Sequence, residues 1–153
     1  MLSAKWMTSV LQRYRLWIGI GILVVGCSYD PSVVYEYRFA DDALHPADTF
    51  EIGDIPKDGI WWLEIRYLKT YPYQNVWIKI ISSSGTDTLI SIALFRPDGL
   101  PYGVRVGPYY RMRAMIPLRK WVRNGPFQMI PYMRPDRVEG MKSWRIRYRK
   151  EEV

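Results

Sequence analysis

Hydrophobic and polar side chains alternate along several short segments in the second part of the chain. Leu63, Ile65 and Tyr67 alternate with Glu64 and Arg66. A period of two residues is that of a strand with one buried face, whereas no long segment beyond residue 28 shows the 3.6-residue period of an amphipathic helix. The pattern predicts half-buried β-strands, and it recurs in four more segments, which are 76–81, 86–95, 110–116 and 144–148.

Turn-forming residues lie between these segments. Ser82-Ser83-Ser84-Gly85 suits a hairpin connection, and in Pro97-Asp98-Gly99 the glycine supplies the positive φ that the turn needs. About seven or eight short strands joined by such turns predict an all-β fold, an antiparallel β-sandwich that occupies residues 33–153 as one domain. Prolines within 109–117 and 127–133 predict edge strands or bulges at those places.

The first 26 residues follow a different pattern. Lys5, Arg13 and Arg15 are the charged residues of this segment, and an uncharged apolar run of ten residues occupies 16–25. A spanning helix needs about 20 apolar residues, so this run is too short to cross a membrane comfortably. A basic segment, a short apolar run and a small residue, here Gly26, are typical of a secretory signal peptide.

Cys27 is the only cysteine of the chain, and it follows this small residue directly. Val24-Val25-Gly26-Cys27 resembles the lipobox of lipoprotein precursors. There the cysteine sulfur is diacylglycerylated, the signal peptide is cut before the cysteine, and the new amino group is usually acylated. An exported domain with structural cysteines would carry them in pairs. We therefore expect a signal peptide over 1–26, cleavage between Gly26 and Cys27, lipid attachment at Cys27, and a lipidated tether over 27–32. The alternative is an uncleaved signal anchor.

The residues after Cys27 bear on the destination of such a lipoprotein. Ser28 stands where an Asp commonly retains lipoproteins at the inner membrane, which favours the outer membrane. Asp30 is a single acid, whereas surface-exposed lipoproteins often carry an acidic cluster there. We therefore expect a lipid-anchored outer-membrane protein that faces the periplasm.

The composition adds a charge asymmetry to this picture. Hydrophobic residues make up 48% and charged residues 24% of the chain, a balance typical of a globular protein. The net charge is +7, and residues 104–153 alone hold 13 basic and 4 acidic side chains. A basic chain suggests a nucleic-acid partner, but an export signal directs it to a compartment without nucleic acid, so we expect no such partner.

Several motifs follow one another in an order that carries a family resemblance. The run from Leu63 to Tyr67 leads into Tyr71-Pro72-Tyr73-Gln74-Asn75-Val76-Trp77. This pair is similar to the arginine-containing strand and the Tyr-Pro-Tyr-x-Asn-Leu-Trp segment of the gliding-motility lipoprotein H family, GldH. The resemblance extends from Val34 to Lys150. Its further pieces are Asp87-Thr88-Leu89, Asp98-Gly99 with Gly103, the run from Gly125 to Arg134, and Gly140-Met141. The chain departs from the family pattern at Lys142-Ser143-Trp144 and in having no Trp after the Asp-Gly turn.

The resemblance implies an outer-membrane lipoprotein of Bacteroidota that faces the periplasm. It implies a structural or accessory component of the gliding motility and type IX secretion machinery. The implied partners are other gliding or secretion lipoproteins, and the resemblance implies no enzymatic activity.

The sequence shows no residue set that is diagnostic of catalysis or metal binding. His45 is the only histidine, so neither a Ser/His/Asp triad nor a multi-His metal site can be built in the usual way. We therefore expect no catalytic residue, no bound metal and no cofactor. The remaining candidates are carboxylates without a distinctive spacing: Asp41, Asp42 and Asp48 for a hard cation, and Asp54 and Asp58 for a glycosidase pair.

Two sets of arginines form a candidate contact surface. Arg145, Arg147 and Arg149 share one side of the last predicted strand, and Arg111 and Arg113 share one side of another. Whether the two sets adjoin depends on the strand order, which the sequence leaves open. Such a surface contacts an acidic protein partner or anionic lipid headgroups, or it is a solvated face that protects the sheet from aggregation.

Aromatic residues offer a second candidate surface. Trp61, Trp62, Trp77 and Trp121 either fill the core of the sandwich or form a platform on which sugars stack. Adjacent positions of a strand point to opposite faces, so one residue of the Trp61–Trp62 pair is the best aromatic candidate for a partner contact. The alternative function is a glycan-binding surface lipoprotein of a polysaccharide-uptake system.

Overall fold

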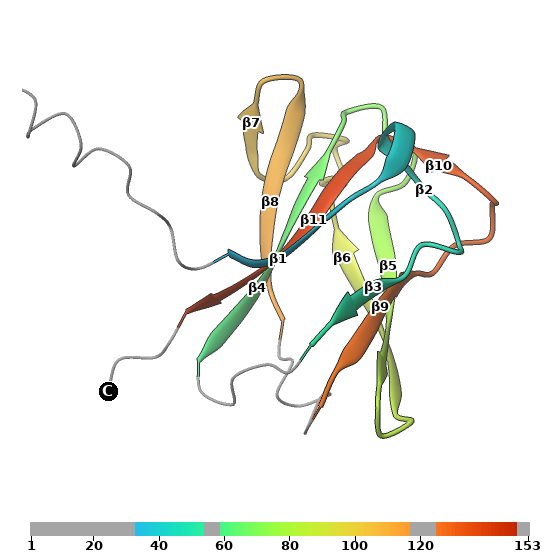
Figure 1. Ribbon diagram of the computed structural model, residues 1–153. Coiled ribbons are helices and arrows are strands. Elements are labelled where there is room, and N and C mark those ends of the chain that lie inside the picture. The colour runs from blue at the N-terminus through green and yellow to red at the C-terminus, as the bar shows by residue number, and fades with distance from the viewer. Residues whose placement is uncertain (1–32, 54–58, 117–124, 150–153) are drawn as a thin grey trace, which may run out of the picture. The chain divides into compact units, whose positions relative to one another are not determined.

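A computed structural model describes residues 33–53, 59–116 and 125–149, and these form a β-sandwich (Figure 1). The expected signal peptide, Cys27 and the tether lie outside the described residues, as do Asp54, Asp58 and Trp121. Within the described residues, no helix is long and apolar enough to span a membrane.

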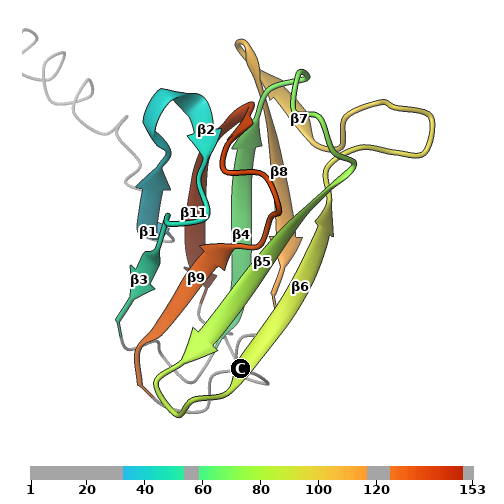
Figure 2. The ribbon, with the colours of Figure 1, turned by 90° about the vertical axis from the view of Figure 1, so that its right-hand side faces the viewer.

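Two antiparallel sheets pack against each other, and Figure 2 shows one in front of the other. The larger sheet has the order β1 (Val33–Arg38), β11 (Met141–Arg149), β4 (Ile60–Tyr67), β8 (Tyr109–Met115) and β7 (Val104–Val106). The smaller sheet has the order β3 (Phe50–Ile52), β9 (Phe127–Pro131), β5 (Asn75–Ser82) and β6 (Asp87–Ala93). The 3₁₀ turn η1 (Ala40–Asp42) leads directly into β2 (Ala43–Leu44). β2 pairs with β10 (Val138–Glu139) in a separate two-stranded ribbon.

The all-β sandwich predicted from the alternating segments is confirmed. Each of the five alternating segments forms a strand, and these are β4, β5, β6, β8 and β11. The described residues contain eleven strands rather than seven or eight. The difference arises because strands such as β2 and β10 are two residues long and leave no alternation to recognise.

The turns behave as their residues predict, but the expectation of edge strands or bulges near the prolines was wrong for both segments. Ser82 donates its backbone N–H to the carbonyl of Thr86 at 2.9 Å and closes the β5–β6 hairpin, in which Gly85 has a φ of 81°. β8 lies between β4 and β7, and β9 lies between β3 and β5, so both are internal strands. Pro131 is tolerated there because β3 pairs with β9 only as far as Met129, so no β3 residue needs the N–H that proline lacks.

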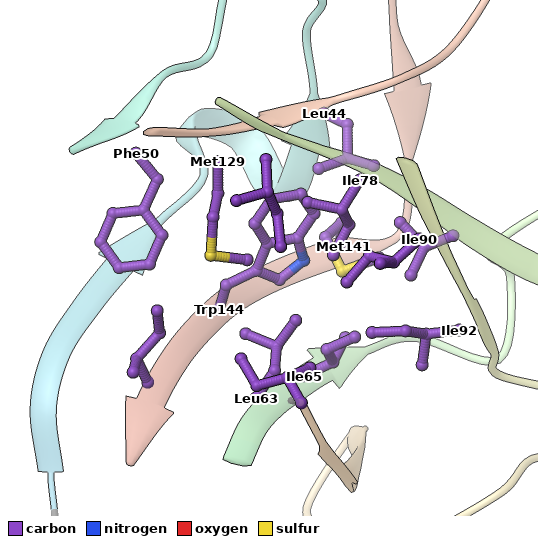
Figure 3. Close-up of a cluster of buried hydrophobic side chains, with 14 of the residues drawn as sticks. Leu44, Phe50, Leu63, Ile65, Ile78, Ile90, Ile92, Met129, Met141 and Trp144 are labelled. Carbon is purple, nitrogen blue, oxygen red and sulfur yellow. The ribbon is translucent and has the colours of Figure 1, made fainter. Parts of the chain in front are cut away.

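The core lies between the two sheets, where the alternate side chains of both meet (Figure 3). Leu63 and Ile65 of β4 and Trp144 of β11 come from the larger sheet, and Ile78 of β5 and Met129 of β9 come from the smaller one. All five side chains are fully buried. Burial of each side chain of this size contributes about 1.5–3 kcal/mol, so this layer supplies the main stabilisation of the fold.

Tyr67 joins the two sheets by a hydrogen bond as well as by packing. Its ring is fully buried, and its hydroxyl donates to the carbonyls of Leu94, at 2.6 Å, and of Tyr102. Leu94 directly follows β6 of the smaller sheet, whereas Tyr67 ends β4 of the larger one. Burial raises the pKa of Tyr67 above its ordinary value, so the hydroxyl remains a donor at any physiological pH.

We predict that Tyr67→Phe lowers the free energy of unfolding by about 1–3 kcal/mol, because the buried carbonyl of Leu94 and the part-buried carbonyl of Tyr102 lose the hydroxyl that they share. Chemical denaturation followed by tryptophan fluorescence measures the change. Tyr132→Phe is the matched control, since the Tyr132 side chain is exposed, and it should unfold like the parent protein. Equal stability of the two variants would contradict the role assigned to the Tyr67 hydroxyl.

Candidate functional site

Glu64 is a fully buried carboxylate in the middle of β4, with an exposed fraction of 0%. Its neighbours Leu63 and Ile65 point into the core, so Glu64 points to the opposite face of the larger sheet. A sheet face that carries a buried charge must cover that charge with other side chains. An isolated buried carboxylate costs several kcal/mol unless cations and hydrogen-bond donors compensate it.

Four guanidinium groups surround the Glu64 carboxylate. The shortest contacts join its oxygens to Nε of Arg113 at 3.0 Å and Nε of Arg147 at 3.1 Å, and Arg145 and Arg66 lie at 3.5 and 3.7 Å. Arg113 on β8 and Arg145 on β11 are the direct cross-strand partners of Glu64. The carboxylate therefore holds together three adjacent strands whose residues are far apart in the chain.

The charges continue along the row that crosses the sheet through Glu64. Glu36 of β1 faces Arg145 and accepts a hydrogen bond from it at 2.8 Å. Burial raises the pKa of Glu36, but hydrogen bonds from Arg145 and Arg38 outweigh this effect and hold the pKa below the ordinary value of 4.5. Arg66 lies two residues after Glu64 on the same face of β4. Burial, and then the nearby positive charge of Arg145, lower the pKa of Arg66, so the guanidinium groups are close enough to repel one another.

The cross-strand register places all these residues on one surface, which we call the arginine face. Arg111 and Arg149 lie on it without an ion pair to any described residue, so its positive charge exceeds its negative charge. Exposed Val104, Val106 and Met115 lie on the same side of the sheet at the β7–β8 edge. The arginine face comprises Arg38, Arg66, Arg111, Arg113, Arg145, Arg147 and Arg149, with Glu36 and Glu64 as its two carboxylates.

The structure brings together the two arginine sets that the sequence left apart. β4 lies between β11 and β8, so Arg145 and Arg147 reach Glu64 from one side and Arg113 reaches it from the other. Arg149 and Arg111 extend this surface toward its two ends. The predicted contact residues of the last strand therefore belong to one continuous basic face that includes β8.

The two adjacent tryptophans point to opposite faces, as their spacing predicts. Trp61 is 2% exposed and packs in the core against Tyr148, so this residue is inaccessible to a partner. Trp62 is half-buried on the arginine face, opposite Arg147. Of the pair, Trp62 is therefore the residue that can touch a partner.

The acidic residues proposed for a cation have separate partners. Asp42 accepts hydrogen bonds from Lys142 at 2.8 Å and from Tyr109 at 2.7 Å, and these outweigh burial and hold its pKa below the ordinary value. Asp48 accepts the backbone N–H of His45 at 2.8 Å. The described part of the chain contains no group of three or more His, Cys, Asp or Glu residues arranged to hold a metal ion.

Sequence reasoning missed Glu64, although a signal for it exists. A charged residue at the centre of a strongly apolar alternating strand, two residues before an arginine, requires compensation from neighbouring strands. Which strands supply it follows only from the sheet order.

Comparison of the chain with family models, curated proteins and solved structures finds no match.

We predict that Glu64→Gln destabilises the fold by about 2–4 kcal/mol. Four guanidinium groups lose their shared counter-charge, and the amide satisfies fewer of their donors. Removal of one member of a fully buried ion pair costs somewhat more than this. Here the Arg113 side chain is 49% exposed, so water can solvate its guanidinium and reduce the loss.

Denaturant unfolding measures this change, and Glu139→Gln is the control because Glu139 is an exposed carboxylate in the β2–β10 ribbon. The control should unfold within about 0.5 kcal/mol of the parent. A Glu64→Gln variant as stable as this control would contradict the organising role of the buried carboxylate.

Proposed function

We propose that this chain is an outer-membrane lipoprotein, anchored through an acylated Cys27, that serves as a structural component of a gliding-motility or type IX secretion assembly. In this proposal its arginine face docks an acidic surface of another protein in that assembly. The lipobox at Val24–Cys27 and the family resemblance support the location and the assembly. The arginine face supports the mode of contact.

One observation carries the docking proposal, and it is the excess of guanidinium groups over carboxylates on a single rigid sheet. Arginine forms bidentate hydrogen bonds with carboxylates, and complementary charge speeds and orients protein association. A surface that served only solubility would intersperse positive and negative side chains. On the arginine face, by contrast, Arg111 and Arg149 have no acidic partner among the described residues.

The tether restricts where the partner can lie. Six peptide units separate Cys27 from Val33, so their extended reach is at most about 20 Å. Val33 begins β1 and pairs with Arg147 of the arginine face. In this proposal an acylated Cys27 would hold Val33, the first residue of β1, within about this distance of the lipid.

Arg111 and Arg149 are the residues with which to test docking. Arg113, Arg145 and Arg147 hold Glu64, so their replacement disturbs the fold as well as the surface. We predict that the double variant Arg111→Glu/Arg149→Glu reduces recovery of the partner at least tenfold when the tagged protein is crosslinked in native membranes and purified.

Lys69→Glu/Arg137→Glu is the matched control, since it makes the same change in charge at exposed positions away from the arginine face. It should recover the partner normally. Cys27→Ala should abolish both membrane attachment and recovery. Equal recovery with the two double variants would contradict docking through arginines. If Arg111→Glu/Arg149→Glu instead loses binding to vesicles with anionic headgroups and recovers the same proteins, the arginine face binds lipid.

A further inference from the structure

A pocket of about 510 Å³ opens on the smaller sheet, where β5 begins and β9 ends. Its volume lies within the range of about 300–1,000 Å³ that is usual for small-molecule sites. The β2–β10 ribbon forms one side of it. The lining comes from the segments 73–77 and 131–135, together with Tyr71, Leu44, Leu89 and Val138.

Three exposed aromatic rings belong to this pocket. Tyr73, Trp77 and Tyr132 are 46%, 45% and 59% exposed. The backbone N–H of Tyr132, which directly follows β9, donates to the carbonyl of Trp77 on β5 at 2.9 Å, so these two residues are neighbours across the sheet. Buried Tyr71 packs edge-on against Tyr73 and supports it from beneath. Rings of this size are normally withdrawn from water, and a cluster of them on the surface marks a contact site.

The polar lining residues of the pocket indicate which chemical groups a ligand would need. Gln74, Asn75 and Arg134 are the lining residues with amide or guanidinium side chains. Asn75 donates to the hydroxyl of Ser91 at 3.0 Å, which fixes the orientation of its amide. Among the described lining residues there is no carboxylate, and Arg134 forms no ion pair with any described residue. The pocket therefore offers aromatic surfaces, amides and one uncompensated cation.

We propose that this pocket binds a saccharide that carries a carboxylate. The C–H face of a sugar ring stacks on Trp77, the amides of Gln74 and Asn75 bind hydroxyl or N-acetyl groups, and Arg134 pairs with the carboxylate. The same chemistry occurs in N-acetylmuramic acid of the cell wall and in uronic acids of external polysaccharides. A proline-rich peptide also packs on aromatic rings, but a neutral peptide gives Arg134 no partner.

This site is independent of the proposed docking function, because it lies on the other sheet of the sandwich. Its test uses the full chain in a detergent without a sugar headgroup, and calorimetry measures binding. The probes are an N-acetylglucosamine–N-acetylmuramic acid tetrasaccharide, trigalacturonate, neutral cellotetraose and a decaproline peptide. We predict that one of the two acidic saccharides binds, which identifies the source, and that cellotetraose binds at least tenfold more weakly.

Variants in the pocket separate stacking from charge recognition. Trp77→Ala should weaken binding of the acidic saccharide at least tenfold, while Trp77→Phe retains most of it. Arg134→Gln should weaken the acidic probe and leave cellotetraose unchanged. Tyr102→Ala is the control, as it removes an exposed aromatic side chain outside the pocket. The proposal is overturned if neither acidic saccharide binds, if binding survives Trp77→Ala in a folded variant, or if decaproline is the probe that binds.

Discussion

The attraction between Glu64 and the arginines around it is the constraint on which the larger sheet depends. A carboxylate without solvent contact is stable only when several donors surround it, and here the donors come from β4 itself and from the strands on either side. A shift of β8 or β11 by one residue would turn the arginines toward the core and leave Glu64 without compensation. The charge cluster thus specifies the register of three strands, in addition to the apolar packing beneath it.

The same cluster explains why the arginine face is suited to contact. Arginines that serve Glu64 are fixed in position, so a partner that binds beside them meets an ordered surface and loses less side-chain entropy on association. Arg111 and Arg149 add charge that Glu64 and Glu36 do not neutralise. If the face docks a partner as proposed, stability and recognition use neighbouring members of one set of residues, and the choice of arginine to replace separates the two roles.

The two sheets present different chemistry to the outside. The larger sheet carries guanidinium groups, whereas the smaller sheet carries Trp77, Tyr73 and Tyr132 around a pocket. The core between them is apolar, and Tyr67 links the two layers by a hydrogen bond. Because the two faces lie on opposite sheets of the sandwich, a partner on one leaves the other free to bind a second molecule.

Much of the fold follows from local pattern, but the site does not. Alternation along β4 and β11 identifies the strands and the faces of Arg145 and Arg147, because a strand has a period of two wherever it lies. Sheet order is not encoded in that period, so the adjacency of β8 and β11 to β4 could not be derived. The aromatic pocket could not be predicted for the same reason, because it depends on which strands are neighbours. Trp77 was one of several candidate aromatics, and its nearness to Tyr132 depends on the pairing of β5 with β9.

Site-specific photocrosslinking in the native host tests the central claim most directly. A photoreactive residue in place of exposed Val104, the cross-strand partner of Arg111, lies beside the arginine face and leaves its arginines intact, and one at position 84 lies in the β5–β6 hairpin as a reference. The account predicts that position 104 captures an envelope protein with an acidic surface, that position 84 does not, and that capture requires Cys27. Capture of lipid alone at position 104, or capture of the same protein at both positions, would contradict it.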